Sequence, residues 1–180
     1  MTTARPTELI RRFDAVEVGV CVAFNRWSDH RSIRLFFSAI SRLGDGVFWY
    51  AWILLLPIAF GTAGAWRALQ LIATGAVGVV IYKWLKHRFV RERPYISHLR
   101  IHVGTAPLDR YSFPSGHTLH AVCYTIMLTA YFPVLAWLVI PFTLLVALSR
   151  VVLGLHYPTD VMVGAAIGAT LAVASMNIVA

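Results

Sequence analysis

The chain has 180 residues and a formal net charge of +8, yet charged residues make up only 13% of it and hydrophobic residues 58%. A soluble domain usually carries about a quarter charged residues. This composition, with a mean hydropathy of +0.68, therefore excludes an ordinary soluble domain and indicates a single membrane-embedded domain over residues 1–180. The basic residues lie at the ends of apolar stretches and in short loops, so we expect them to face lipid headgroups and predict no nucleic acid partner.

The N-terminal part of the chain predicts one short span and one surface helix. Residues 9–27 are apolar enough for a marginal first span, although Asp14 and Glu17 interrupt them. Residues 31–43 place apolar and basic side chains on opposite faces of a helix, which predicts an amphipathic helix lying flat at the membrane interface. The run Gly44-Asp45-Gly46 then turns the chain inward.

Further apolar stretches reach or approach the length of about 20 residues that a spanning helix needs. The uncharged run 118–148 is too long for one span, and Pro133 divides it because proline ends or kinks a helix. Together with the marginal first span, these apolar stretches predict an all-α integral membrane bundle of about six transmembrane helices. The expected spans are 47–66, 68–88, 114–132, 134–154 and 158–179, and the expected active-site loop is 93–113.

Three short polar groups of residues interrupt the apolar chain. In the expected topology, the helix ending near Lys86 and the helix starting near His117 meet on one side of the membrane, and the helix ending near Arg150 returns to that side. Cations and histidines are costly to hold near a bilayer, so their convergence on one face indicates a functional site. The groups are Lys86 with Arg93-Pro94, then Pro114-Ser115-Gly116-His117, then Ser149-Arg150 with His156 and Asp160.

The cations suit a site that binds a phosphoryl group, because phosphoryl transfer depends mostly on positioning and on positive charge around the phosphate oxygens. Lys86, Arg93 and Arg150 supply that charge. Each of them alone has a second interpretation as an interfacial anchor that reaches lipid headgroups. We expect Arg88 and Arg91 to be such anchors.

The group around His117 lies where a helix is expected to begin. Helix N-termini offer backbone N–H groups to anions, and Gly116 lets a phosphate come close. The Ser115 hydroxyl either donates to the same anion or is an ordinary helix cap. His117 then either protonates a leaving oxygen or stands by without a role.

His156 and Asp160 are four residues apart, at the junction of a loop with the last helix. A carboxylate on one imidazole nitrogen fixes the tautomer and makes the other nitrogen a better nucleophile. The alternative is a structural histidine bonded to a helix cap. The remaining histidines are His87, His98, His102 and His120. Their spacing does not complete a set of metal ligands, so we predict no metal and no cofactor.

The three groups in this order resemble the signature of the type 2 phosphatidate phosphatase family, which is K-x6-RP, then PSGH, then SR-x5-H-x3-D. The sequence matches every defined position, and the stretch from Asp109 to Phe113 also looks like the family. The resemblance implies a six-helix membrane bundle that removes phosphate from a lipid without a metal, and the short loops and small size are typical of a bacterial member.

The resemblance also implies a role for each matching residue. His156 is the nucleophile that forms a phosphohistidine, Asp160 orients it, and His117 is the general acid for the leaving group. The residues that hold the phosphoryl oxygens are Lys86, Arg93, Ser115, Gly116 and Arg150.

Two observations give opposite predictions for the side of the membrane that the site faces. The family habit implies a bacterial inner-membrane protein with its site facing the periplasm. The excess of Lys and Arg on cytoplasmic loops points the other way, because most basic residues here lie on the site's side. Several of them are expected phosphate ligands, which weakens the charge rule, so we predict a periplasmic site.

The motif residues are expected to contact only the phosphate group of the substrate, so the sequence is compatible with several functions. The main one is hydrolysis of a phosphomonoester or diphosphate of a membrane lipid, such as phosphatidate, phosphatidylglycerophosphate or undecaprenyl diphosphate. A phosphoenzyme can also pass its phosphate to a second lipid instead of water. The third possibility is a non-catalytic lipid-binding or transport protein on the same scaffold.

Overall fold

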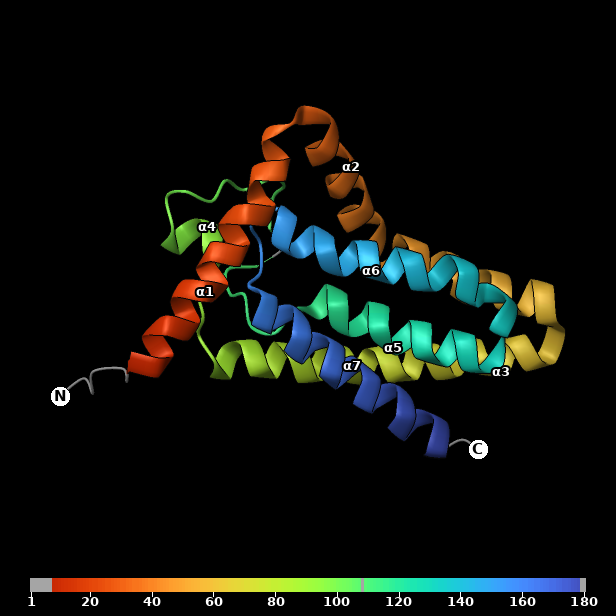
Figure 1. The fold of residues 1–180 in the computed structure, drawn as a ribbon. Coiled ribbons are helices and arrows are strands. Elements are labelled where there is room, and N and C mark those ends of the chain that lie inside the picture. The colour runs from red at the N-terminus through yellow and green to blue at the C-terminus, as the bar shows by residue number, and fades with distance from the viewer. Residues whose placement is uncertain (1–7, 108, 179–180) are drawn as a thin grey trace.

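The computed structural model describes residues 8–107 and 109–178, and their regular structure is helical apart from one isolated antiparallel bridge between Glu92 and Tyr111. This all-α architecture, seen in Figure 1, confirms the predicted fold class. In chain order the elements are α1 (Glu8–Asn25), η1 (Arg26–Asp29), α2 (Arg31–Arg42), η2 (Leu43–Val47), α3 (Phe48–Arg88), α4 (Pro94–Ser97), α5 (Gly116–Tyr131), η3 (Pro133–Leu135), α6 (Ala136–Val152) and α7 (Pro158–Ile178).

The longest helix, α3, doubles back on itself at Gly61. This residue has φ 59° and ψ −139°, a backbone conformation that suits glycine, and Pro57 just before it lacks an amide hydrogen. Beside the turn the two arms lie so close that a Cβ atom on Gly64 would be 2.0 Å from the carbonyl oxygen of Leu56, and Figure 1 shows the arms joined at this end of the bundle. The expected spans 47–66 and 68–88 meet at residue 67, which is helical; the chain turns at Gly61 instead, because the glycine conformation breaks the helix there.

Three helical stretches of the described residues are long and apolar enough to cross a membrane: Arg31–Arg88, Pro133–Val152 and Pro158–Ile178. They make the chain a multi-pass membrane protein. Large apolar side chains such as Ile58 and Trp137 are exposed on its surface, as contact with lipid requires. The count of six spans and the interfacial position of α2 remain predictions.

Helix α5 lies at the centre of the bundle and packs against α3, α6 and α7. Its contact with α7 is close because two glycines spaced four apart face it. A Cβ atom on Gly164 would lie 2.5 Å from the carbonyl oxygen of Ser115, and one on Gly168 would lie 2.3 Å from that of Leu119. Small residues at this spacing let two membrane helices approach backbone to backbone.

The start of α5 is also tied to the start of α7 by a backbone hydrogen bond. The amide of Ser115 donates to the carbonyl of Asp160 at 3.0 Å. Together with the glycine contact, this bond fixes the second and third polar groups of the sequence beside each other.

The apolar core lies between α3, α5 and α6. It packs aromatic and branched side chains closely, with the rings of Phe48 and Phe142 stacked 3.8 Å apart between centroids. Its larger buried members are Trp49, Leu56, Leu71, Tyr124, Met127, Leu128, Phe142 and Val146. This core holds the arms of α3 against α5 and so shapes the cavity described next.

Candidate active site

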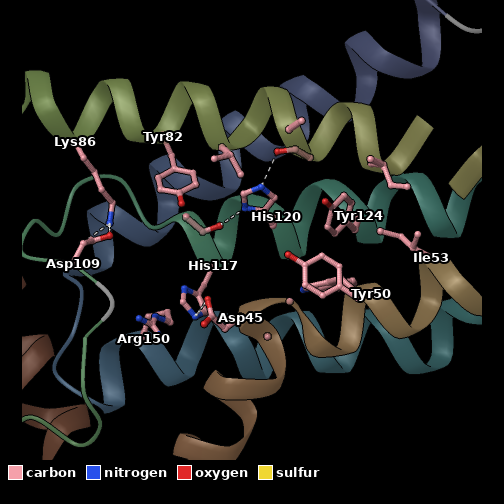
Figure 2. Close-up of a pocket in the computed structure, with 18 of the residues that line it drawn as sticks. Asp45, Tyr50, Ile53, Tyr82, Lys86, Asp109, His117, His120, Tyr124 and Arg150 are labelled. Atoms are coloured by element: carbon pink, nitrogen blue, oxygen red, sulfur yellow. Dashed lines mark hydrogen bonds and ion pairs between the residues drawn. The ribbon is translucent and has the colours of Figure 1, made fainter. Parts of the chain in front are cut away.

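A cavity of about 520 Å3 runs between the two arms of α3, α5 and α6. Figure 2 shows Lys86, Asp109, Arg150 and His117 gathered toward one end and Ile53 toward the other. The charged end is completed by Arg93 and His156, whereas the remaining wall is mostly apolar or aromatic: Trp49, Tyr50, Ile53, Leu54, Ile72, Ala76, Val79 and Tyr124. One cavity therefore joins a cationic end to an apolar end.

Two of the predicted cations converge on one carboxylate. The ammonium of Lys86 donates to both carboxylate oxygens of Asp109, at 2.8 and 2.6 Å, and a guanidinium nitrogen of Arg93 donates to one of them at 2.8 Å. Burial by itself raises the pKa of Asp109, but Lys86 and Arg93 outweigh it and hold that pKa below its ordinary value. This end of the cavity is thus built to stabilise negative charge.

The third cation, Arg150, is 2% exposed and keeps a donor without a partner. One of its terminal nitrogens donates to the hydroxyl of Ser41 on α2, but its Nε atom is buried and has no hydrogen-bond partner. A buried unpaired donor is costly to the folded protein. A bound anion with several oxygens would satisfy it.

His156 lies in the loop between α6 and α7 and is 1% exposed. Its Nε2 atom is 3.3 Å from a guanidinium nitrogen of Arg93, and a guanidinium only donates. Nε2 must therefore accept, which leaves the ring proton on Nδ1, 3.6 Å from a carboxylate oxygen of Asp160. Burial, and then the charges of Arg150, Arg93 and Lys86, hold the pKa of His156 well below 6.5, so the imidazole is neutral and keeps a lone pair on Nε2.

Asp160 is fully buried and is itself held from two sides. One oxygen accepts from the amide of Tyr157 at 2.9 Å, and the other accepts from a guanidinium nitrogen of Arg91 at 2.8 Å. Arg91 also donates to Glu17 of α1 at 2.5 Å and stacks on the ring of Tyr157, 3.9 Å from its centroid. Glu17 in turn accepts from the amide of Thr159 at 2.9 Å.

This network corrects the sequence interpretation of Arg91. We expected a headgroup anchor, and that prediction was wrong: its guanidinium links two buried carboxylates and is only 31% exposed. The network also explains why Glu17, the acid that made the first span marginal, occurs in an apolar segment: its side chain is buried and pairs with Arg91. An acid within an apolar segment was the available signal, but its partner is 74 residues away.

The residues at the start of α5 separate into two groups. Gly116 and His117 line the cavity. Ser115 is fully buried and caps the helix, accepting from the amide of Thr118 at 3.4 Å and contacting its hydroxyl at 3.0 Å. The structure thus brings together at the cavity Lys86, Arg93, Gly116, His117, Arg150 and His156, and sets Ser115 and Asp160 behind them.

His120, which the sequence left without a role, lies one turn beyond Gly116. Its Nδ1 is 2.9 Å from the carbonyl of Gly116 and its Nε2 is 3.1 Å from the carbonyl of Gly75. It links α5 to the returning arm of α3 and lines the same cavity.

The sequence places Asp45 in a turn and does not identify it as a residue of the site. Asp45, on the turn η2, lies 3.4 Å from Nε2 of His117, an ion-pair distance when the imidazole is protonated. The only hint in the sequence was an acid between two glycines. Within residues 8–107 and 109–178, no three His, Cys, Asp or Glu side chains cluster closely enough to hold a metal ion.

The profile of the PAP2 superfamily matches residues 67–180, well over half of the chain, so the chain belongs to this superfamily. It is 33% identical over 114 residues to undecaprenyl-diphosphatase BcrC of Bacillus subtilis (strain 168), covering 63% of this chain and 58% of the relative. It is 42% identical over 91 residues to decaprenylphosphoryl-5-phosphoribose phosphatase of Mycolicibacterium smegmatis, covering 49% of this chain and 45% of the relative. The chain thus spans about half the length of these curated relatives.

Solved structures share the fold over most of the chain. The PAP2 type phosphatidylglycerolphosphate phosphatase from Bacillus subtilis superposes with a TM-score of 0.72 at 24% identity, covering 96% of this chain and 87% of that one. Aquifex aeolicus LpxE superposes with a TM-score of 0.74 at 26% identity, covering 86% of this chain and 93% of that one. The likeness extends to the N-terminal helices that precede the matched profile.

Proposed function

We propose that this protein is a lipid phosphate phosphatase that works through a phosphohistidine. One observation carries the proposal: the neutral Nε2 of His156 meets three cationic side chains at one end of a cavity whose other end is apolar. Such a cavity fits a molecule with a phosphate at one end and a hydrocarbon chain at the other. Relatives named for phosphatase activity on polyprenyl and glycerol lipids support the same substrate class.

The proposed reaction has two steps. In the first, Nε2 of His156 attacks phosphorus and the bond from phosphorus to the lipid oxygen breaks, while His117 gives that oxygen a proton. In the second, water attacks the phosphohistidine and His117 takes a proton from it, which releases inorganic phosphate and restores both histidines. Asp160, with an oxygen 3.6 Å from Nδ1 of His156, orients the ring and stabilises the positive charge that develops on it.

The cations stabilise the phosphoryl oxygens in both steps. Lys86, Arg93 and Arg150 surround the position next to His156, and the backbone at Gly116 offers the N-terminus of α5. A phosphate entering this site takes over the bonds that Lys86 and Arg93 make to Asp109. We assign Ser115 a smaller part, shaping the start of α5 through its cap while its hydroxyl remains a candidate donor.

The site recognises a phosphate and an apolar chain, which several lipids share. The candidate substrates are phosphatidate, phosphatidylglycerophosphate, undecaprenyl diphosphate and a lipid A phosphate. Transfer to a second lipid is the alternative, because a phosphoenzyme can pass its phosphate to any hydroxyl placed beside it. We further propose a bacterial inner-membrane location with the site on the periplasmic side, following the habit of the family over the charge rule.

The test is phosphate release from a panel of these lipids by the purified protein in detergent. We expect release from at least one lipid, undiminished by excess EDTA and inhibited by vanadate, which mimics five-coordinate phosphorus. His156→Ala abolishes it, whereas His87→Ala, on an exposed histidine of α3, does not. Turnover of no lipid would refute the phosphatase, and activity that EDTA removes and magnesium restores would refute metal independence.

Trapping the intermediate tests the histidine roles directly. His117→Ala slows hydrolysis of the phosphoenzyme, so it should accumulate with a labelled aryl phosphate. An alkaline quench should then leave base-stable, acid-labile label on His156. Label on Ser115 instead, or activity of His156→Ala equal to that of the wild type, would overturn the assignment.

A further inference from the structure

The general acid faces an electrostatic difficulty. His117 must be protonated to protonate a lipid alkoxide, yet it lies among the positive charges of Lys86, Arg93 and Arg150. Like charges nearby and burial both disfavour a protonated imidazole. Some group close to His117 must offset them if the proton is to be present when the substrate binds.

We infer that Asp45 is a positioning residue that keeps His117 protonated and oriented for proton transfer, an assignment that rests on the proposed function. Of the described residues lining the cavity, two are carboxylates, Asp45 and Asp109. Asp109 is bonded to Lys86 and Arg93, whereas Asp45 has its Oδ1 atom 3.4 Å from Nε2 of His117. Asp45 is therefore the carboxylate placed beside His117, where it also faces the positive charge of Arg150.

The turn η2 is shaped to present this side chain. Gly44 is buried against α6, where a Cβ atom would lie 2.7 Å from a methyl of Val146, and Gly46 has φ 135°, a conformation that favours glycine. Packing against Val146 therefore favours glycine at position 44 and the backbone favours it at position 46, and the acid between them points into the cavity (Figure 2).

The pairing also decides which nitrogen gives up its proton. Nε2 of His117 faces Asp45, so the Nε2 proton stays on that side and the Nδ1 proton is the one transferred. Nδ1 passes its proton to the leaving oxygen as the phosphorus–oxygen bond breaks, and the ring becomes neutral with its remaining proton on Nε2, the nitrogen nearer to the carboxylate. Water attack in the second step returns a proton to Nδ1.

Other groups around the cavity act on the same proton. The titratable or charged residues that line the cavity with His117 and Asp45 are Tyr50, Tyr82 and Lys86 of α3, Arg93 and Asp109 of the loop, His120 and Tyr124 of α5, Arg150 of α6 and His156 before α7. The substrate phosphate adds negative charge of its own. If that charge alone kept His117 protonated, Asp45 would be dispensable, so the experiment compares these two cases.

The test is Asp45→Asn, measured on an alkyl phosphomonoester lipid and on nitrophenyl phosphate. An alkoxide needs a proton to leave and a nitrophenolate does not. We expect kcat on the alkyl ester to fall roughly 10- to 100-fold, part of the 10²–10⁴-fold that general acid catalysis contributes, with little change on the aryl ester. Both rates come from one preparation, so their ratio is independent of the fraction that folds.

The pH profile gives a second readout that a purely structural role would not move. Loss of the carboxylate lets His117 lose its proton at lower pH, so the alkaline limb for the alkyl ester should shift down by about one pH unit. Asp29→Asn, the same change on an exposed acid of η1, is the matched control and should leave both rates and the profile unchanged.

The outcomes separate the two proposals. A wild type that turns over no lipid phosphate refutes the phosphatase. A wild type that hydrolyses both esters while Asp45→Asn lowers both rates equally, or lowers neither and keeps its pH profile, refutes the role of Asp45 and leaves the phosphatase standing.

Discussion

Removal of Arg91 should destabilise the protein strongly, although it lies outside the cavity. Its guanidinium pairs with Glu17, whose side chain is 4% exposed, and with Asp160, which is fully buried. Arg91→Ala leaves both carboxylates without their cation. The ion pairs through which Arg91 links α1 to the start of α7 are then lost.

The magnitude follows from the burial of the partners. Removing one member of a buried ion pair costs about 3–5 kcal/mol, because the remaining charge stays buried. Arg91 itself is 31% exposed, and water entering from that side lowers the cost, so we expect about 3 kcal/mol. For a chain of this size, that lowers the unfolding midpoint by roughly 6–12 °C.

The assay is thermal unfolding in detergent, followed by circular dichroism. Arg88→Ala removes a neighbouring exposed arginine and is the matched control, with an expected change within about 0.5 kcal/mol. In a Glu17→Gln background, Arg91→Ala should cost less, because one of the two stranded charges is gone.

Two results would refute this reasoning. One is an Arg91→Ala midpoint equal to that of Arg88→Ala, which would mean that water replaces the guanidinium. The other is full additivity of the Glu17→Gln and Arg91→Ala changes, which would show that the two side chains are not coupled.

Three further predictions follow from other parts of the structure. Gly164→Ala places a methyl 2.5 Å from the carbonyl oxygen of Ser115, so unfolding measurements should show a loss of about 1–3 kcal/mol, whereas Gly19→Ala, with nothing within 4 Å, should show none. A cysteine at Thr105 should react with a membrane-impermeant maleimide in intact spheroplasts; labelling only after lysis would reverse the proposed topology. Because burial and nearby cations lower the pKa of His156, the unfolded chain binds a proton near pH 6.5 that the folded protein rejects, so stability is lost as the pH falls below 6.5, by up to about 1.4 kcal/mol per pH unit. Unfolding of His156→Gln should lose less over the same range, and an equal slope would contradict the assignment.

The class of fold and most of the candidate site could be predicted from the sequence. The length of an apolar stretch is set by the thickness of the membrane, so spans can be recognised directly. Lys86 and Arg93 are close in sequence, as are Arg150 and His156, so each pair can be recognised from its spacing. Counting helices from one polar group to the next then placed them on one face. Such patterns are short in range, so they can be read along the chain without knowing what packs against what.

The partners of these residues were decided only by the tertiary structure. Arg91 and Glu17 are 74 residues apart, and Asp45 meets His117 across two different helices. The turn in α3 lies at Gly61 because the backbone there takes a conformation that residue type permits but does not require. Ion pairs and close backbone approaches depend on which faces the packed helices bring together, and the local pattern of one sequence carries no record of that pairing.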